Sequence, residues 1–151
     1  MLEYLADKSR RMTELEARQR LEVFEHDESV HQNTEFVANS PRRTKVVCAL
    51  AKGPLTRKYI CRTTGISSGH MGEVLKSMEK WYLVECRTPQ LRRHLTYDLT
   101  QSGKTVLRIL AALAILWENE TSLTPLEQPL LDKLKEVLDD SIEASNSNEW
   151  P

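Results

Sequence analysis

The sequence of 151 residues has three cysteines and no long hydrophobic run, and both shortages exclude classes of protein. Its longest uncharged apolar run, 109–117, has nine residues, whereas a membrane-spanning helix needs about 20. The charged N-terminus has no apolar segment of the kind found in a signal peptide. Cys48, Cys61 and Cys86 match neither a zinc pattern nor a disulfide framework. We therefore expect a cytoplasmic protein with reduced thiols and no membrane partner.

Motifs of catalysis and cofactor binding are also missing. The sequence contains no Gly-rich phosphate loop, no His-Glu-x-x-His, no Cys-x-x-Cys and no nucleophile elbow. His26 and His31 lie in an acidic segment, but their spacing of five does not place both on one face of a helix. We therefore predict no catalytic residues, no cofactor and no metal, and hence a protein that is not an enzyme.

The net charge of −1 conceals a strong segregation of charge along the chain. Residues 40–105 carry thirteen basic and four acidic residues, a net charge of +9, while residues 1–39 carry −4 and residues 106–151 carry −6. All five glycines also lie within 40–105. Because charges act over about 8–10 Å at physiological salt, a basic segment between acidic flanks is typical of a module that binds a polyanion.

The basic segment has the pattern of two short helices joined by a turn, following a first helix. Ser40-Pro41 starts the first helix and Gly53-Pro54 ends it. Thr56 caps a helix over 57–64, Gly65 forms the turn, and a serine at 67 or 68 opens the next helix. That third helix has one apolar stripe, made of Met71, Val74, Leu75 and Met78. The arrangement is that of a helix-turn-helix.

A β-hairpin with a basic tip is predicted directly after the third helix. Residues 81–87 have β propensity, a loop with a proline follows, and apolar residues alternate over 94–99. Helix-turn-helix and hairpin together predict a winged helix. We expect a mainly α fold with a small β wing over 40–105, an N-terminal helical extension over 1–39 containing a helix at about 2–28, a C-terminal helical region over 106–144, and a disordered tail over 145–151.

Residues 41–107 resemble the winged helix-turn-helix of the MarR, ArsR and PadR groups of prokaryotic transcription regulators. The resemblance is carried by "ALAKGPLT", "YICRTTGISSGHMGEVLKSMEK" and "YLVECR", and by "YDLTQSGKTVL" after the wing. One departure is Trp81-Tyr82, where such domains usually have a glycine before the first wing strand. The resemblance implies a dimeric regulator that binds double-stranded DNA.

In the docking geometry that this resemblance implies, the third helix, at about 68–81, enters the major groove of DNA with its N-terminal residues leading. The predicted base contacts are Ser68, Gly69, His70 and Glu73. The wing, at about 87–94, would reach the DNA backbone or minor groove. The predicted phosphate contacts are Arg42, Arg43, Lys45, Arg57, Lys58, Arg62, Lys76, Lys80, Arg92 and Arg93.

A helix predicted at 102–118 is apolar on nearly all sides and therefore needs cover on all sides. That cover is the N-terminal helix, a second chain, or both. We expect a homodimer, the arrangement usual for the resembling regulators, with dimerisation residues Leu107, Leu110, Leu113, Ile115, Leu116 and Trp117. Thr124 and Pro125 are expected to start the last helix.

Two classes of function fit these observations. The first is a sequence-specific regulator that binds double-stranded DNA as a homodimer. The second is a winged helix used for protein–protein interaction in a chromosome or transcription assembly, in which the basic surface meets an acidic partner. A small-molecule effector between the winged domain and the dimer helices is a further option, and nothing in the sequence identifies a ligand.

Overall fold

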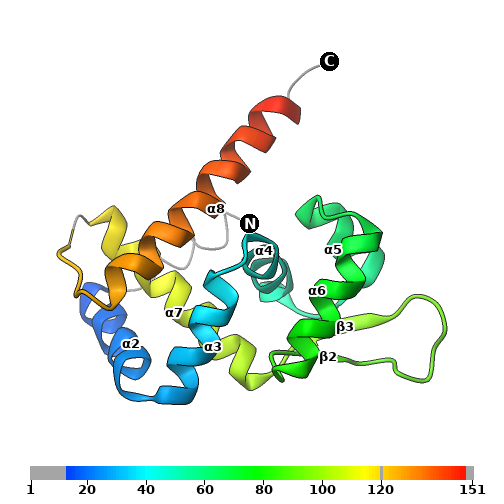
Figure 1. The fold of residues 1–151 in the computed structure, drawn as a ribbon, viewed down its shortest axis with the longest axis horizontal. Helices are drawn as coiled ribbons and strands as arrows, with labels where there is room; N and C mark the ends of the chain where they lie inside the picture. Colours follow the sequence, from blue (N-terminus) through cyan, green and yellow to red (C-terminus); the bar gives the residue numbers. More distant parts are fainter. Residues whose placement is uncertain (1–12, 120, 149–151) are drawn as a thin grey trace.

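The computed structural model describes residues 13–119 and 121–148. Figure 1 shows a row of helices with a hairpin extending from one end. In chain order the elements are α2 (Glu14–His26), α3 (Glu28–Ala38), α4 (Pro41–Ala49), η1 (Leu50–Lys52), β1 (Leu55–Thr56), α5 (Arg57–Thr64), α6 (Ser68–Lys80), β2 (Val84–Cys86), β3 (Thr96–Leu99), α7 (Gln101–Glu118) and α8 (Glu127–Asn148). None of the described helices has the length and apolar character that a membrane span requires.

The predicted winged helix is confirmed. Ser40 caps α4 by accepting the Arg43 N–H at 3.3 Å, and Thr56 caps α5 by accepting the Tyr59 N–H at 3.3 Å. Gly65 ends α5 in the left-handed conformation, with φ of 74°. The sheet has the antiparallel order β1-β3-β2, so β3 is its central strand. Strand β1 is an addition to the predicted hairpin.

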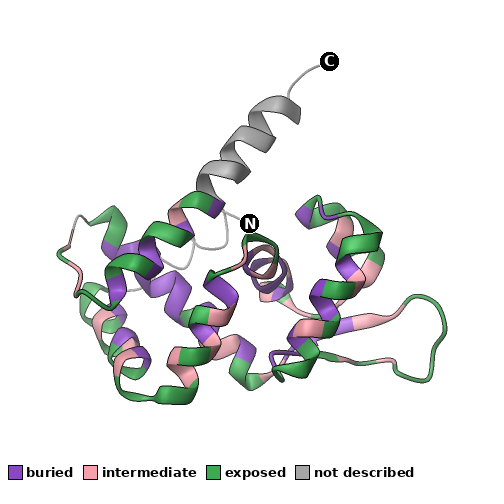
Figure 2. Cartoon of the chain, in the orientation of Figure 1, coloured by how far each residue is buried: buried purple, intermediate pink, exposed green. Residues whose placement is uncertain are grey.

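Helix α7 runs through the middle of the fold and is covered within one chain. It packs against α2, α3, α4 and α8, and Figure 2 shows it as mostly buried. Among the residues expected to form a dimer contact, Leu107, Leu110, Leu113, Ile115 and Leu116 are all at most 5% exposed. Trp117 is 39% exposed, with the Lys135 ammonium 5.4 Å from its ring centroid. The first five therefore belong to the intrachain core, because α2 and α8 supply the missing cover.

The described part of the N-terminal extension, residues 13–39, contains two helices, so the single helix expected over about 2–28 ends at His26. Asp27 has an extended backbone, and its side chain accepts the Val30 N–H at 3.1 Å, which caps α3. Helix α2 buries Ala17, Leu21 and Phe24. Residues 1–12, which include part of the expected helix, lie outside the described residues.

The last helix begins two residues later than expected, at Glu127. Thr124 and Glu127 form a capping box: Thr124 Oγ1 accepts the Glu127 N–H at 3.3 Å, and Glu127 Oε1 accepts the Thr124 N–H at 3.1 Å. Pro129 fits because it lies in the first turn, where no intrahelical N–H bond is needed. Helix α8 runs to Asn148 and thus enters the segment 145–151 expected to be a disordered tail.

Candidate nucleic-acid interface

The outer face of α6 carries the four residues predicted to contact bases. Ser68, Gly69, His70 and Glu73 are all exposed, whereas Met71, Val74, Leu75 and Met78 are buried against the domain. The amphipathic pattern therefore orients the helix as predicted. A Cβ added at Gly69 would meet no atom within 4 Å, so the first turn of α6 presents open backbone to solvent.

Ser67 fixes both the start of α6 and the His70 ring. Its Oγ accepts the His70 backbone N–H at 3.4 Å and lies 2.9 Å from His70 Nδ1. Because Nδ1 has this partner, Nε2 is the ring nitrogen left to face an external group. His70 can therefore offer one donor or one acceptor at a defined position, depending on its tautomer.

The wing lies beside the start of α6. Figure 1 shows the loop between β2 and β3 extending away from the helices, and Figure 2 shows it as almost wholly exposed. Arg92 and Arg93 are exposed in this loop. A cavity of about 390 Å³ separates the wing from α5 and the start of α6. It is lined by Arg57, Lys58, Cys61, Ser68, Arg92, Arg93, His94 and Leu95.

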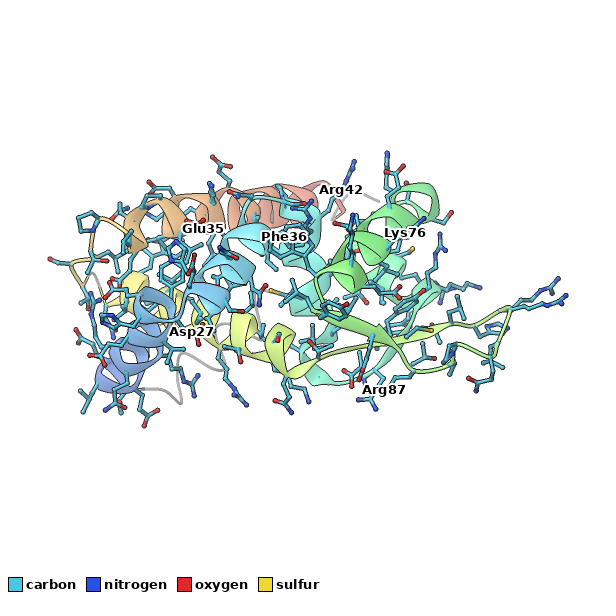
Figure 3. All side chains as sticks on the ribbon, turned by 60° about the horizontal axis from the view of Figure 1, so that its bottom comes forward. Asp27, Glu35, Phe36, Arg42, Lys76 and Arg87 are labelled. Atoms are coloured by element: carbon cyan, nitrogen blue, oxygen red, sulfur yellow. The ribbon has the colours of Figure 1, made fainter. Side chains whose placement is uncertain are left out.

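Seven of the ten predicted phosphate contacts are exposed side chains without an ion pair to another described residue: Arg42, Lys58, Arg62, Lys76, Lys80, Arg92 and Arg93. Figure 3 places Arg42 and Lys76 on the same side of the molecule and Arg87 on the opposite side. Arg87 is paired with Asp98 at 2.8 Å. The exposed cations thus come from α4, α5, α6 and the wing loop.

Arg43, Lys45 and Arg57 are partly buried, and two of them make contacts inside the protein. Arg43 donates to the Phe36 carbonyl at 2.9 Å and lies over the Phe36 ring, 3.8 Å from its centroid. Phe36 in turn stacks on Trp81, with centroids 4.0 Å apart. Partial burial lowers the pKa of the Arg43 guanidinium. Arg43 therefore helps to join α3 and α4 to the end of α6.

Arg57 connects three elements at the edge of the cavity. Its backbone N–H donates to the Leu95 carbonyl of the wing at 2.9 Å, and its Nη2 donates to the Ser68 carbonyl of α6 at 2.6 Å. Sequence reasoning missed both contacts because they join residues 38 and 11 positions apart. The Gly72 position is the one signal that could have indicated a close neighbour there.

Hydrogen bonds join the base of the wing to the residues that follow α6. Tyr82, where the resembling domains usually have glycine, has φ of 57°, so this position needs the left-handed conformation. Thr100 Oγ1 donates to the Tyr82 carbonyl at 2.5 Å and accepts the Gly103 N–H at 3.1 Å, while the Thr100 N–H donates to the Leu83 carbonyl at 3.0 Å. A Cβ at Gly103 would lie 2.2 Å from Leu83 O. The glycine therefore permits backbone contact between α7 and the wing.

A second group of basic side chains lies away from this interface. Arg20, Lys52, Lys104 and Arg108 line a cavity of about 300 Å³ between α2, η1, β3 and α7, together with Asp98. Lys52 and Lys104 belong to the basic segment, whereas Arg20 and Arg108 belong to the flanks. The +9 charge of residues 40–105 is therefore divided between two faces.

His31 and Cys48, which lie outside the interface, have structural explanations. His31 pairs with Glu35 at 3.0 Å and stacks on Phe24, and the described residues contain no group of His, Cys, Asp and Glu that could hold a metal. Cys48 is buried, and burial raises the pKa of its thiol to about 12. Cys61 is partly exposed in the cavity beside the wing.

No known family model and no curated protein matches the sequence. Among solved structures, RV1404 from Mycobacterium tuberculosis is similar, with 20% identity, coverage of 84% of this chain and 85% of that chain, and a TM-score of 0.47. MepR from S. aureus in complex with DNA is 19% identical, with coverage of 85% and 87% and a TM-score of 0.37. A glutamine-to-proline mutant of MepR from a multidrug-resistant clinical isolate is 20% identical, with coverage of 98% and 94% and a TM-score of 0.36. By its own order of helices and its three-stranded sheet, the chain is a winged helix-turn-helix protein.

Proposed function

We propose that the chain is a sequence-specific transcription regulator that binds double-stranded DNA. In this proposal α6 enters the major groove with Ser68, Gly69, His70 and Glu73 leading, and the wing loop contacts the backbone or the minor groove. The observation that carries the proposal is the convergence of α5, the start of α6 and the basic wing loop around one cavity. Three separate elements thus offer exposed cations to one elongated polyanion.

The distribution of charge supports a nucleic acid as the partner. Lys76 and Lys80 lie one turn apart on the exposed face of α6, and Arg92 and Arg93 lie in the wing loop. Phosphates on both sides of a groove would meet these two groups of cations. The acidic flanks would repel phosphate and would therefore favour one orientation of docking.

We further propose that the regulator acts as a homodimer, with a contact different from the one expected at the buried face of α7. Figure 1 shows the C-terminal end of α8 extending beyond the other elements. A short helical segment that makes no packing contacts is only marginally stable in water. We therefore propose that the end of α8 packs against a second copy of the chain. Two recognition helices would then meet half-sites about 34 Å apart.

The test is fluorescence anisotropy with a randomised duplex pool, and with duplexes selected from that pool, over 50–300 mM salt. We expect selected duplexes to bind about a thousandfold more tightly than the pool, with steep salt dependence. Arg92→Ala/Arg93→Ala should weaken binding to all duplexes and lower the salt slope by about one unit per lost phosphate contact. The matched control is Arg20→Ala/Arg108→Ala, which removes two cations from the other cavity.

Other results would lead to other conclusions. Absence of binding at low salt would overturn the DNA proposal and favour the acidic protein partner instead. Equal loss in the wing and control variants would show that only the overall charge matters. Sedimentation of the free protein as a monomer at the concentrations used for binding would overturn the dimer proposal.

A further inference from the structure

The position of Arg57 relative to α6 differs from that of a simple phosphate contact. Its guanidinium lies across the first turns of α6, with Nη2 at 2.6 Å from the Ser68 carbonyl oxygen. This is a charge-assisted hydrogen bond to a backbone group of the residue that begins the helix. The neighbouring Lys58 is exposed and has no such contact with another described residue. Two adjacent cations on α5 therefore occupy different environments.

Gly72 leaves open the space beside α6 that the Arg57 guanidinium occupies. A Cβ at residue 72 would lie 3.1 Å from Arg57 Nη2 and 3.7 Å from Cζ and Nη1, so the whole guanidinium plane covers the space where a side chain would begin. Glycine inside a helix costs about 1 kcal/mol relative to alanine. Gly72 is therefore explained by a contact inside the protein. Gly69, by contrast, has open space around it.

The same residue also holds the wing. The Arg57 N–H donates to the Leu95 carbonyl, and Thr56, immediately before it, pairs with Thr96 in the sheet. Arg57 thus fixes the start of α6 through its side chain and the end of the wing loop through its backbone. These are the two parts of the molecule that the proposed function brings to DNA.

We propose that Arg57 is a positioning residue that fixes the N-terminal turn of the recognition helix α6 relative to the wing, through the space that Gly72 leaves open. This inference rests on the proposed function, because its expected consequence is a change in discrimination between DNA sequences. A small rotation of the first turn displaces Ser68, His70 and Glu73 together, so the contacts with bases weaken while the contacts with phosphates persist.

The DNA-binding test compares Arg57→Gln with Lys58→Gln on a selected duplex and on a scrambled duplex of equal length. We expect Arg57→Gln to reduce the ratio of the two affinities about tenfold, the effect of losing one good base contact, with the salt slope nearly unchanged. Lys58→Gln, as a phosphate contact, should weaken binding to both duplexes and lower the slope by about one. The proposal is overturned if both variants give the Lys58 result.

A second test needs no DNA and therefore separates this proposal from the proposed function. Amide hydrogen exchange of the free protein should become faster in the second turn of α6, whose N–H groups donate to the carbonyls of the first turn, in Arg57→Gln and in Gly72→Ala. It should remain unchanged in Lys58→Gln. Because glycine is a poor helix former, Gly72→Ala should raise Tm in the Arg57→Gln background and should raise it less, or lower it, in the wild type. Equal shifts in Tm in the two backgrounds, with unchanged exchange, would overturn the positioning role even if the wild type binds DNA.

Discussion

Substituting Gly103 by alanine tests the joint between α7 and the wing. The new Cβ would lie 2.2 Å from Leu83 O, 3.1 Å from Leu99 Cδ2 and 3.2 Å from Leu83 C. Two of these three neighbours are backbone atoms, so the clash cannot be relieved by rotating a flexible side chain. The start of α7 and the Leu83 backbone, which lies just before β2, must move apart by about 1 Å, because real Cβ contacts shorter than about 3 Å essentially do not occur.

The expected magnitude follows from what this movement breaks. Overpacking in a dense core costs about 2 kcal/mol, and the Thr100 bonds to Leu83 O and Tyr82 O contribute about 1 kcal/mol each. Alanine recovers about 1 kcal/mol through its better helix propensity. We therefore expect Gly103→Ala to lower the free energy of unfolding by about 3 kcal/mol, and Tm by about 10 °C for a chain of this size.

The assay is urea unfolding followed by far-UV circular dichroism, with thermal unfolding as a check. Gly69→Ala is the matched control, because a Cβ there meets nothing within 4 Å. That variant should leave the free energy of unfolding unchanged or raise it by up to about 1 kcal/mol. An unchanged or higher Tm for Gly103→Ala would refute the argument that α7 and the Leu83 backbone are in contact.

Three further predictions concern other parts of the chain. Tyr82→Gly should raise the free energy of unfolding by about 1 kcal/mol, measured in urea, because glycine adopts the positive φ of this turn without strain. Cys48 should resist Ellman's reagent at pH 8 in the folded protein while Cys61 reacts. The raised pKa of the Cys48 thiol contributes stability that is complete below about pH 9 and is lost as the pH rises towards 12. Cys48→Ala should therefore flatten the alkaline fall in the free energy of unfolding. Arg18→Met should destabilise the fold by about 3 kcal/mol in the same urea assay, because it leaves the Glu127 carboxylate, 1% exposed, without its cation; Arg18→Met/Glu127→Gln should recover part of this loss.

The sequence predicts the winged domain well because its signals are local. Ser40, Thr56 and Gly65 each act on backbone groups within four residues, so the ends of α4 and α5 can be read without tertiary information. Strand β1 has no such signal: its two residues are extended because they pair with Tyr97 and Thr96, some forty positions later. Helix periodicity also failed at Asp27, because the charged pattern continues on both sides of the residue that divides α2 from α3.

At the candidate interface, too, local sequence patterns predict some features, whereas others depend on contacts that form only in the folded protein. Exposure of the α6 face follows from its apolar stripe, and the basic wing loop follows from Arg92-Arg93. The partners of individual cations do not follow from the sequence. Arg43 and Arg57 are cations in helical settings similar to those of their exposed neighbours Arg42 and Lys58. Only the packed fold brings Phe36 and Ser68 within their reach.

The cover of α7 by α2 determines when the N-terminal part of the chain can fold during synthesis. Helix α2 is made first, but it packs most extensively on α7, which ends at Glu118. At about 5–20 residues per second, roughly five to twenty seconds pass between the two. The winged domain lies between the two helices in the sequence and can form during that interval. The apolar face of α2 therefore remains exposed on the nascent chain after the winged domain has emerged, and this face is where we expect chaperone binding and early aggregation.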